Sequence, residues 1–479
     1  MDAERGRGTV SLYIPPMPKP SEGKLPLRKR VQKALRSGIG FFQTGSYAVG
    51  IGRHKIPRLP GMRQRYTYTV REPAAMREVL VDRAADFPKS RLMYSMLEPL
   101  IGYSVFVSNG ETWRKQRAII DEAFEHARLR DIFPKMRDAA DGLCARLSAH
   151  AADGNVVAID REATQVAADI IFRTIFSEPI DDATAADLFQ TFEQFQGLAY
   201  AHGMASLADI PMWLMPGRLR SRRKARRMRR VLGGLLDKRI AARAAGQPTP
   251  DDDILATLIT SVDPDTGRPL GREALLNEIA VLFLAGHETS AAALAWSLYL
   301  LANCPAVQER VREEALAVLG DRQPEFADIK RLTFTRDVFR EALRLYPPLP
   351  TVTRDSTRRE QMGKRSIDPG SVVFVQTWLL QRNREIWPEA DAFDPDRWAC
   401  PYAKEAQRQA YLPFSLGPRV CVGAGFAMQE ATLILAMLVR RFRFAAVLGD
   451  SPPEPAARLT LRSANGIRLM ITPVRDQKA

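Results

Sequence analysis

One apolar stretch without proline limits the fold of this chain most strongly. From Gly271 to Leu301 the residues are mainly apolar and no proline interrupts them, and the stretch ends just before Asn303 and Pro305. A helix of about 30 residues, at about 1.5 Å per residue, is about 45 Å long, which is the width of a domain of this size. We therefore expect a long helix that crosses the core of a mainly α-helical protein with small β-sheets.

Local signals also organise the rest of the chain. Residues 1–24 are rich in proline and predict an irregular lead-in. Residues 25–479 show neither an internal repeat nor a long linker, so we expect a single domain there. Short strands are expected at 65–70 and 371–377. Near the C terminus, the segment TLRSANGIRLMI places Asn-Gly between alternating apolar residues and predicts a two-residue β-hairpin.

The composition excludes several classes of protein. With 46% hydrophobic and 26% charged residues, the chain is typical of soluble globular proteins and lacks the signature of disorder. Its longest apolar runs are shorter than the roughly 18 uninterrupted residues that a spanning helix needs. No signal peptide opens the chain, so we predict a cytoplasmic protein with reduced thiols. The four cysteines and five histidines form no zinc motif.

The net charge of +15 raises the possibility of a nucleic-acid partner. Basic residues gather at 25–36 and 218–230, but no aromatic residues interleave with the second cluster, and its basic residues spread nearly all round the predicted helix. The first cluster has apolar residues near helical spacing, which permits weak contact with an anionic membrane surface. We favour solvated helices at both places, with no nucleic-acid partner and at most peripheral membrane contact.

The segment LGPRVCVGAG contains a cysteine, an arginine and glycines that could together bind one ligand. A lone cysteine is ordinarily a small buried hydrophobe. Cys421, however, leads into a helix expected from about residue 424, whose unpaired N–H groups favour a thiolate. Gly417 and Gly423 permit tight turns and the close approach of a flat ligand, and Arg419 can bind a carboxylate. The segment therefore predicts a thiolate ligand for a carboxylated macrocycle.

With Phe414 included, the pattern Phe-x-x-Gly-x-Arg-x-Cys-x-Gly resembles the haem-binding signature of the cytochrome P450 superfamily of haem-thiolate monooxygenases. The resemblance implies the cytochrome P450 fold and haem b, iron protoporphyrin IX, as the cofactor. It implies that Cys421 is the metal ligand and that Phe414, Gly417, Arg419 and Gly423 help to bind the haem.

A Glu341-Ala-Leu-Arg344 sequence precedes this segment. In isolation such a pair at i and i+3 would be an ordinary surface pair that contributes about 0.2 to 0.5 kcal/mol. It resembles the ExxR motif of the family, and Arg397 in FDPDRW resembles the arginine that completes a buried ion-pair triad. The resemblance implies a structural role for these three residues together.

The expected long helix contains the sequence Ala285-Gly286-His287-Glu288-Thr289. One interpretation has Thr289 bonded to a carbonyl one turn earlier and Glu288 facing water. Yet Gly286 costs a helix about 1 kcal/mol relative to alanine, and so needs a reason. The segment resembles the AGxxT oxygen-activation motif, which implies that Gly286 leaves room for O2 and that Glu288 and Thr289 deliver protons. We do not favour His287 as an iron ligand.

Trp113 and Arg117 stand at i and i+4 and would share one helical face. They resemble the WxxxR pair of the family, whose members contact a haem propionate. Arg354 matches a second propionate-binding position. Gln381 stands where many members have histidine, which leaves a propionate contact there in question.

Substrate contacts are expected in the loop before the WxxxR pair, in a lid-like region around 198–214, on the long helix near residue 283, at 349–352, and near the C terminus at 461–465. Those we select are Phe106, Phe283, Ala285, Leu349, Val352 and Ala464. Most residues in these regions are apolar, which favours a small hydrophobic organic substrate. For each of them, simple packing in the core is the alternative.

Together the motifs imply a monooxygenase that inserts one oxygen atom of O2 into a hydrophobic substrate by hydroxylation. No GxGxxG sequence follows a strand, so electrons must come from a separate partner, either ferredoxin with ferredoxin reductase or a flavoprotein. An acidic partner would suit this cationic chain. The alternatives are a non-catalytic haem-binding or sensor protein and a peroxide-driven haem peroxygenase. Glu288 and Thr289 argue against the latter, which typically lacks the acid and alcohol pair.

Overall fold

The computed structural model describes residues 12–20, 26, 33, 36–39, 42, 44–48, 50–56, 64–124 and 126–474. Most of the proline-rich lead-in and of the basic segment 25–36 lies outside the described residues. The α-helices in the described residues are α2 (Pro73–Arg77), α3 (Arg91–Ile101), α4 (Gly110–Ala123), α5 (His126–Ala152), α6 (Ile159–Phe176), α7 (Asp182–Leu207), α8 (Arg218–Ala244), α9 (Ile254–Thr260), α10 (Arg272–Ala302), α11 (Pro305–Leu319), α12 (Thr333–Leu345), α13 (Thr377–Leu380), α14 (Ala403–Ala410) and α15 (Ala424–Arg441). Short helical turns include η3 (Met212–Leu214), η5 (Pro395–Ala399) and η6 (Gly417–Arg419).

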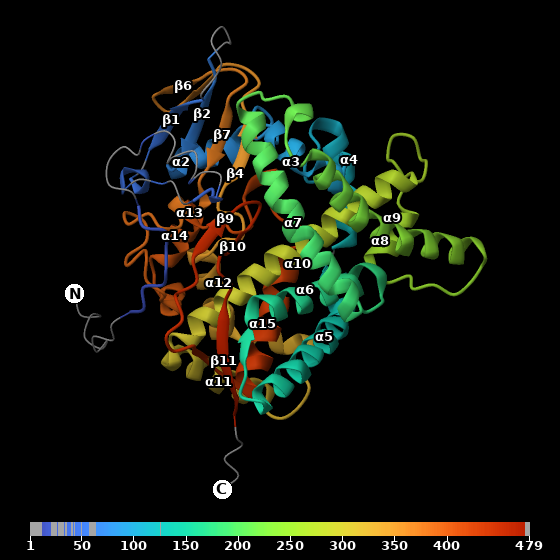
Figure 1. The fold of residues 1–479 in the computed structure, drawn as a ribbon, viewed down its shortest axis with the longest axis vertical. Coiled ribbons are helices and arrows are strands. Elements are labelled where there is room, and N and C mark those ends of the chain that lie inside the picture. Colours follow the sequence, from blue (N-terminus) through green and yellow to red (C-terminus); the bar gives the residue numbers. More distant parts are fainter. Residues whose placement is uncertain are drawn as a thin grey trace.

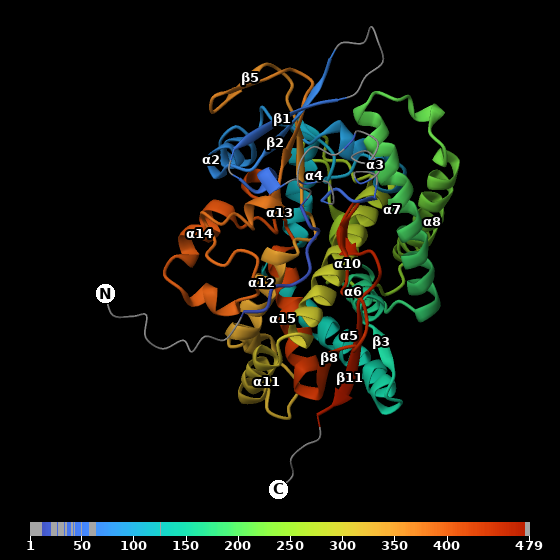
Figure 2. The same cartoon turned by 60° about the vertical axis from the view of Figure 1, so that its left-hand side comes forward.

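The strands are short and form small sheets at the edges of the helical body (Figure 2). They are β1 (Ile51–Lys55), β2 (Tyr66–Val70), β3 (Val156–Ala158), β4 (Val352–Asp355), β5 (Glu360–Met362), β6 (Arg365–Ile367), β7 (Val372–Val375), β8 (Phe442–Ala446), β9 (Pro455–Ala457), β10 (Leu461–Ser463) and β11 (Arg468–Pro473). The largest sheet has the order β1-β2-β7-β4, in which only β2 and β7 run parallel. The two strands expected at 65–70 and 371–377 are confirmed as β2 and β7.

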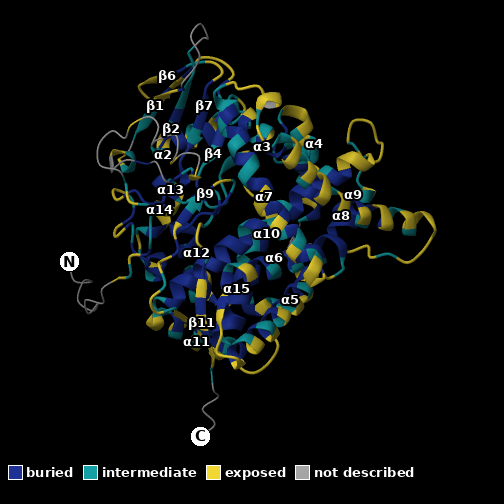
Figure 3. Ribbon diagram, viewed as in Figure 1, coloured by how far each residue is buried: buried dark blue, intermediate teal, exposed yellow. Residues whose placement is uncertain are grey.

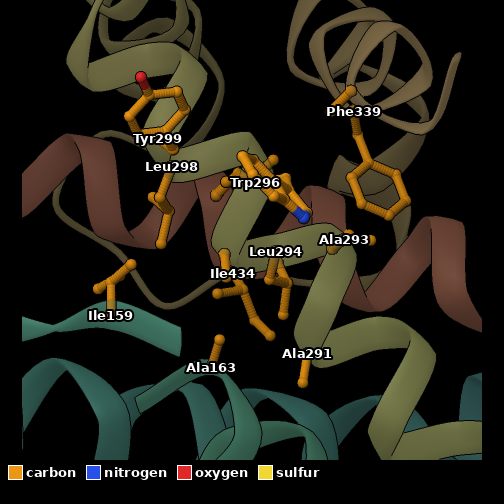
Figure 4. Packing of buried hydrophobic residues seen from close by; sticks show 14 of the residues in the cluster. Ile159, Ala163, Ala291, Ala293, Leu294, Trp296, Leu298, Tyr299, Phe339 and Ile434 are labelled. Carbon is orange, nitrogen blue, oxygen red and sulfur yellow. The ribbon is translucent and has the colours of Figure 1, made fainter. Parts of the chain in front are cut away.

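The long central helix is confirmed as α10, which passes through the middle of the molecule (Figure 1). It packs against α6, α12 and α15, so it is surrounded by other helices along most of its length. Leu294 and Trp296 of α10 share one buried cluster with Ala163 of α6 and Ile434 of α15 (Figure 4). Because apolar residues occur on all its faces, α10 is stable only inside such a core.

Among the described residues, α10 is the one helix long and apolar enough to cross a membrane, and 83% of its most apolar window is buried inside the protein. Burial of this kind marks the core helix of a folded protein. The predicted cytoplasmic location is not tested by this observation and stays a prediction.

The predicted C-terminal hairpin is wrong. Strand β10 pairs with β9, whereas β11 pairs with β3 and β8, so Asn465 and Gly466 connect two different sheets. Gly466 does adopt a positive φ of 79°, as the dipeptide predicts. The Asn465 side chain, however, accepts a hydrogen bond from the Glu454 N–H at 2.7 Å, which ties the turn to the segment before β9. Tertiary contacts thus decide where the chain goes after the turn.

The basic segment 218–230 forms the first half of α8, but its side chains are not equally exposed. Exposed turns are visible along α8 in Figure 3. Residues at helical spacing nevertheless form a buried stripe: Ser221, Ala225, Met228, Leu232, Leu236 and Arg239. The expectation of basic residues nearly all round a solvated helix is therefore corrected, since α8 is amphipathic.

Candidate active site

A cavity of about 660 Å³ lies beside the middle of α10, and its size is typical of sites for small molecules. Segments from across the chain form its wall, which includes Val105, Phe106, Trp113, Ile171, Met204, Val281, Leu282, Ala285, Gly286, Thr289, Leu349, Val352, Leu379, Leu412, Phe414, Cys421 and Leu459. Ala285 is exposed to this cavity, whereas the rest of α10 beyond it is mostly buried. One stripe of the core helix therefore faces an internal, mainly apolar space.

The loop before α15 places Cys421 on the wall of this cavity. The Cys421 N–H donates to the Phe414 carbonyl oxygen at 2.9 Å, which closes the loop. Gly417 has φ of 70°, and a β-carbon there would overlap the carbonyl oxygen of Leu80. Only glycine fits this position, because both the backbone conformation and the close approach of the Leu80 segment exclude a side chain. A β-carbon at Gly423, by contrast, would lie 3.9 Å from the Cys421 sulfur, an ordinary contact.

The Cys421 side chain opens on the cavity although it lies deep inside the protein. Burial raises the pKa of its thiol, while the Gly423 N–H and the cations of Arg117 and Lys89 act in the opposite direction. The helix N–H group thus acts as the sequence predicts, but burial is the larger effect. The free sulfur is therefore a thiol at neutral pH, and a bound metal ion must displace its proton.

Basic side chains from α4 and from the cysteine loop meet on the same cavity wall as Cys421. The Arg419 guanidinium stacks on the Trp113 ring at 4.1 Å and donates to the Ser108 carbonyl at 2.8 Å. Its Nη1 atom is buried and has no partner among the described residues. Arg117 instead donates to the Val420 carbonyl at 2.8 Å and pairs with Asp121. Trp113 and Arg117 therefore do share one helical face, and both contact the cysteine loop.

Lys89 joins these cations, and the sequence did not single it out. It lines the cavity, and its pKa is well below its ordinary value because it is buried and lies near Arg354 and Arg419. Arg354 is buried and donates to the Thr353 carbonyl, but it does not line the cavity. Among the described residues no carboxylate pairs with any of the three, whose contacts include the Phe106 ring for Lys89 and backbone carbonyls for the two arginines. Buried cations without counter-charges are unfavourable, so this cluster is suited to a bound anion. A single lysine in DFPKS carries no local signal of this role.

The structure brings Glu341, Arg344 and Arg397 together in a buried cluster. Arg344 donates to both carboxylate oxygens of Glu341 at 3.0 and 2.7 Å, and Arg397 donates to one of them at 2.8 Å. Burial would raise the pKa of Glu341, but the two guanidinium groups hold it below its ordinary value. Both arginines also donate to backbone carbonyls of residues 388–392, and Arg344 donates in addition to the Gln381 carbonyl. The cluster therefore ties α12 to the segment that leads to the cysteine loop.

Gln381 does not line the cavity. Its side chain donates to the Leu343 and Arg344 carbonyls at 3.0 and 2.8 Å and accepts from the Leu412 N–H at 2.7 Å. It joins the end of α12 to the start of the cysteine loop, which is a structural position.

Comparison with known proteins agrees with this geometry. The model of the cytochrome P450 family matches residues 55–469. The chain belongs to the cytochrome P450 family. It is 30% identical over 416 residues to Protein LUTEIN DEFICIENT 5, chloroplastic, of Arabidopsis thaliana, which covers 84% of this chain and 69% of that protein. It is 31% identical to the cyclooctat-9-en-7-ol 5-monooxygenase of Streptomyces melanosporofaciens, over 80% of this chain and 81% of that protein.

Among solved structures, the haem domain of cytochrome P450DA has a TM-score of 0.74 at 23% identity and covers 89% of both chains. The expected fold is thus confirmed. As a cytochrome P450, the chain is a haem-dependent oxidoreductase of the monooxygenase class, and haem b is its cofactor. The residues present fit this group, because a cysteine sulfur faces the cavity and a buried cationic cluster with an unpartnered Arg419 Nη1 stands beside it.

The oxygen segment of this cytochrome P450 presents two of its predicted residues to the cavity. Thr289 lies on the wall, and its hydroxyl donates to the Ala285 carbonyl at 2.6 Å, as the simpler interpretation expected. Gly286 also lies on the wall. A β-carbon at Gly286 would lie 2.7 Å from Ile171 Cδ1, so the close approach of α6 is a packing reason for glycine here.

Glu288 and His287 do not line the cavity. Arg462 donates to both carboxylate oxygens of Glu288 at 2.7 Å, and Thr460 donates to one at 2.6 Å. Burial would raise the pKa of Glu288, but Arg462 above all holds it below its ordinary value. The interpretation in which Glu288 faces water is therefore wrong. His287 stacks on Phe283 at 4.5 Å, away from the cavity, and so is not placed to bind a metal there.

Four of the six selected substrate residues line the cavity, namely Phe106, Ala285, Leu349 and Val352. Two do not. Phe283 is 1% exposed and packs edge-on against Phe172 at 5.6 Å, which is the core-packing alternative. Ala464 is exposed and outside the cavity. Residues 457–459 take its place, because the chain between β9 and β10, and not the turn after β10, points inward.

Proposed function

We propose that this cytochrome P450 hydroxylates a small hydrophobic organic molecule, using O2 and electrons from a separate redox partner. The observation that carries the proposal is a mainly apolar cavity that holds both Cys421 and Thr289 in its wall. A substrate bound among Phe106, Leu349 and Val352 would lie in the same space as these two groups. When bound, haem supplies the electron-transfer and oxygen-activating chemistry, and the protein supplies ligation, orientation and exclusion of water.

We assign the roles of the protein side chains as follows. Cys421 is the metal ligand, within a loop shaped by Phe414, Gly417 and Gly423. Arg419, Lys89 and Arg354 provide the positive charge that haem propionates require, and Trp113 supports the Arg419 guanidinium through its ring face. Their shared feature is that, in the part of the chain that the structure describes, none of them pairs with a carboxylate. Arg117 supports the loop through its backbone carbonyl contacts.

Thr289 is the proton-handling group on the cavity wall. Its Oγ1 lies on the cavity wall and can hand a proton to a group bound there once the hydroxyl turns away from the Ala285 carbonyl. Glu288 lies behind it as a buried carboxylate held by Arg462. Proton delivery by Glu288 itself would require this ion pair to open, and it stays a prediction.

The ligand assignment is tested by Cys421→Ser. We expect this variant to lose the Soret band that is characteristic of a thiolate-bound ferrous carbonyl haem. Cys400→Ser, which changes a cysteine outside the cavity wall, is the matched control and should keep the band. Retention of the band in Cys421→Ser would refute the assignment.

The redox partner that we propose is a ferredoxin with its reductase, or a flavoprotein, and we place the whole reaction in one haem domain formed by residues 25–479. Consumption of NADPH with surrogate partners, together with an oxygenated product, supports this function. Haem binding without turnover across broad substrate classes would favour the non-catalytic haem-binding or sensor alternative, and turnover with peroxide alone would favour a peroxygenase.

A further inference from the structure

Glu278 is a buried acid for which the proposed reaction has no use. It lies on α10 one turn before Leu282, a residue of the cavity wall, and it is 3% exposed. Both of its carboxylate oxygens lie 3.2 Å from the backbone nitrogen of Val105, which donates to them. Among the described residues no lysine or arginine forms an ion pair with it. A buried carboxyl group held mainly by one backbone donor is unfavourable, so its presence needs a reason.

Its contact is with the chain between α3 and α4, residues 102–109, which we call the 102–109 segment. Val105 and Phe106 of this segment line the substrate cavity. Glu278 therefore bonds directly to the backbone of the residues that form one side of that cavity.

The start of the 102–109 segment is anchored to the same helix. Gly102 has φ of 52°, and a β-carbon there would overlap the Asn277 side chain. Arg229 of α8 donates to the Leu100 carbonyl at 2.8 Å and to Asn277 Oδ1 at 2.9 Å. Asn277 thus packs against Gly102 at the start of the segment, and Arg229 links Asn277 to the end of α3, whereas Glu278 bonds to the middle of the segment.

We propose that Glu278 is a positioning residue that sets where Val105 and Phe106 stand in the cavity, and thereby which molecules fit. This inference rests on the proposed function, because it concerns the substrate side of the same cavity. The carboxyl group fixes the Val105 backbone, and the position of the neighbouring Phe106 ring follows. Removal of the carboxyl group releases the middle of the segment, while the packing of Gly102 against Asn277 at its start is unchanged.

The charge on Glu278 depends on pH near neutrality. Burial raises the pKa of Glu278 to about 7, and the Val105 N–H acts against this rise. Charged groups also face this region, but each has its own partner. Lys115 lies beside Glu278 on a smaller cavity of about 210 Å³ and pairs with Asp263 at 3.2 Å and Asp265 at 2.6 Å.

From α8, Arg229 pairs with Glu273 at 2.5 Å. A carboxylate accepts a hydrogen bond more strongly than a neutral carboxyl group does. The 102–109 segment is therefore held more firmly above pH 7 than below it.

The test uses nitrogen ligands of two sizes, imidazole and clotrimazole, and follows their binding by the shift of the haem absorption spectrum. Glu278→Ala should weaken clotrimazole binding by about fivefold or more, as loss of a hydrogen bond to a charged group permits. Imidazole is too small to need the 102–109 segment, and its Kd should stay within about twofold. Glu278→Gln keeps an acceptor and should lose less affinity. Exposed Glu313→Gln is the control for a change of charge.

The pH arm separates positioning from a general loss of structure. We compare the clotrimazole Kd of Glu278→Gln with that of the wild type as a ratio, because the titration of the azole itself affects both values equally and cancels. This ratio should rise between pH 6 and pH 8, since only the wild type gains a carboxylate over this range. A ratio that does not change with pH would overturn the inference. So would a Glu278→Ala variant whose affinity for both azoles equals that of the wild type, or is reduced by the same factor for both. A wild-type protein that shows no spectral response to either azole would overturn the proposed function instead, and the inference with it.

Discussion

At the scale of single residues, Gly417 shows how strongly one position can depend on its surroundings. Its φ is 70° and the Leu80 carbonyl oxygen occupies the space of a side chain, so two independent reasons require glycine. Gly449 has a similar φ of 81°, but none of the residues that the structure describes comes within 4 Å of its β-carbon position. The two glycines therefore separate the effect of backbone conformation from that of steric overlap.

We predict that Gly417→Ala lowers the free energy of unfolding by more than Gly449→Ala does. The second change should cost about 1 kcal/mol, because only the backbone is strained. The first should cost about 1 to 3 kcal/mol more and should reduce haem content, because the loop must move away from Leu80. Urea unfolding and the absorbance ratio of haem to protein measure both effects. If both variants lost the same free energy of unfolding, the cysteine loop would be able to move away from Leu80 without a cost.

Glu430 is a second residue whose surroundings decide its charge. It is 1% exposed on α15, and Ser290 of α10 donates to its carboxyl group at 2.7 Å. Burial raises the pKa of Glu430 to about 8, and the Ser290 hydrogen bond only partly opposes this. The folded protein therefore holds a proton that the unfolded chain releases near pH 4.5.

The resulting pH dependence follows from proton linkage. Between about pH 4.5 and pH 8 the folded state binds more protons at this position than the unfolded state, so the free energy of unfolding decreases as pH rises through this window. We predict that Glu430→Gln, which cannot ionise, removes part of this decrease. Its free energy of unfolding should therefore fall less between pH 5 and pH 8 than that of the wild type. Denaturant unfolding at the two pH values tests this, with the exposed Glu313→Gln as control. Parallel profiles for all three proteins would contradict the prediction.

At the scale of elements, the buried Glu341 cluster is the connection between α12 and the segment before the cysteine loop. Breaking a buried pair by removing one partner leaves uncompensated charges, whereas a surface pair contributes little. The pair of Glu309 and Arg312 has the same i, i+3 spacing but is partly exposed, at 33% and 21%. The Glu309 and Arg312 pair therefore serves as the partly exposed control for the buried pair of Glu341 and Arg344.

We predict that Glu341→Ala costs about 3 to 5 kcal/mol of unfolding free energy and prevents stable haem incorporation. Glu309→Ala should cost less than about 1 kcal/mol. Thermal unfolding and haem content of the purified variants provide the measurement. A Glu341→Ala protein as stable as Glu309→Ala would mean that the backbone carbonyl contacts of the two arginines suffice without the carboxylate.

At the scale of the whole molecule, the net charge of +15 is a property of the entire chain and acts over distance. The proposed redox partner approaches the protein through the positive electrostatic field that this net charge produces. An acidic partner is attracted more strongly at low salt, because added ions screen the interaction beyond about 10 Å at 0.1 M.

We predict that the rate of the first electron transfer from an acidic ferredoxin falls several-fold when ionic strength rises from about 0.05 to 0.5 M. Stopped-flow reduction of the haem measures this rate. Reduction by dithionite, which needs no protein docking, serves as the control for effects of salt on the haem site itself. A rate that does not change with salt would contradict electrostatic steering by this chain.

The sequence alone determined the features that depend on short stretches of chain. The core helix α10, strands β2 and β7, the turn at Gly417 and the positions of the cysteine and ExxR segments follow from local periodicity, from proline and glycine, and from motif spacing. Such signals are local because backbone conformation and helix length are set by neighbouring residues.

Only the tertiary structure decided what surrounds each side chain. It paired Glu288 with Arg462, buried Phe283 against Phe172, and turned Ala464 away from the cavity. It also placed Lys89 beside the cysteine loop and made burial the main influence on the Cys421 thiol. The physical reason is that the burial and the charged neighbours of a side chain depend on segments that are far apart in the chain and pack together only in the folded protein. No single stretch of sequence contains this information.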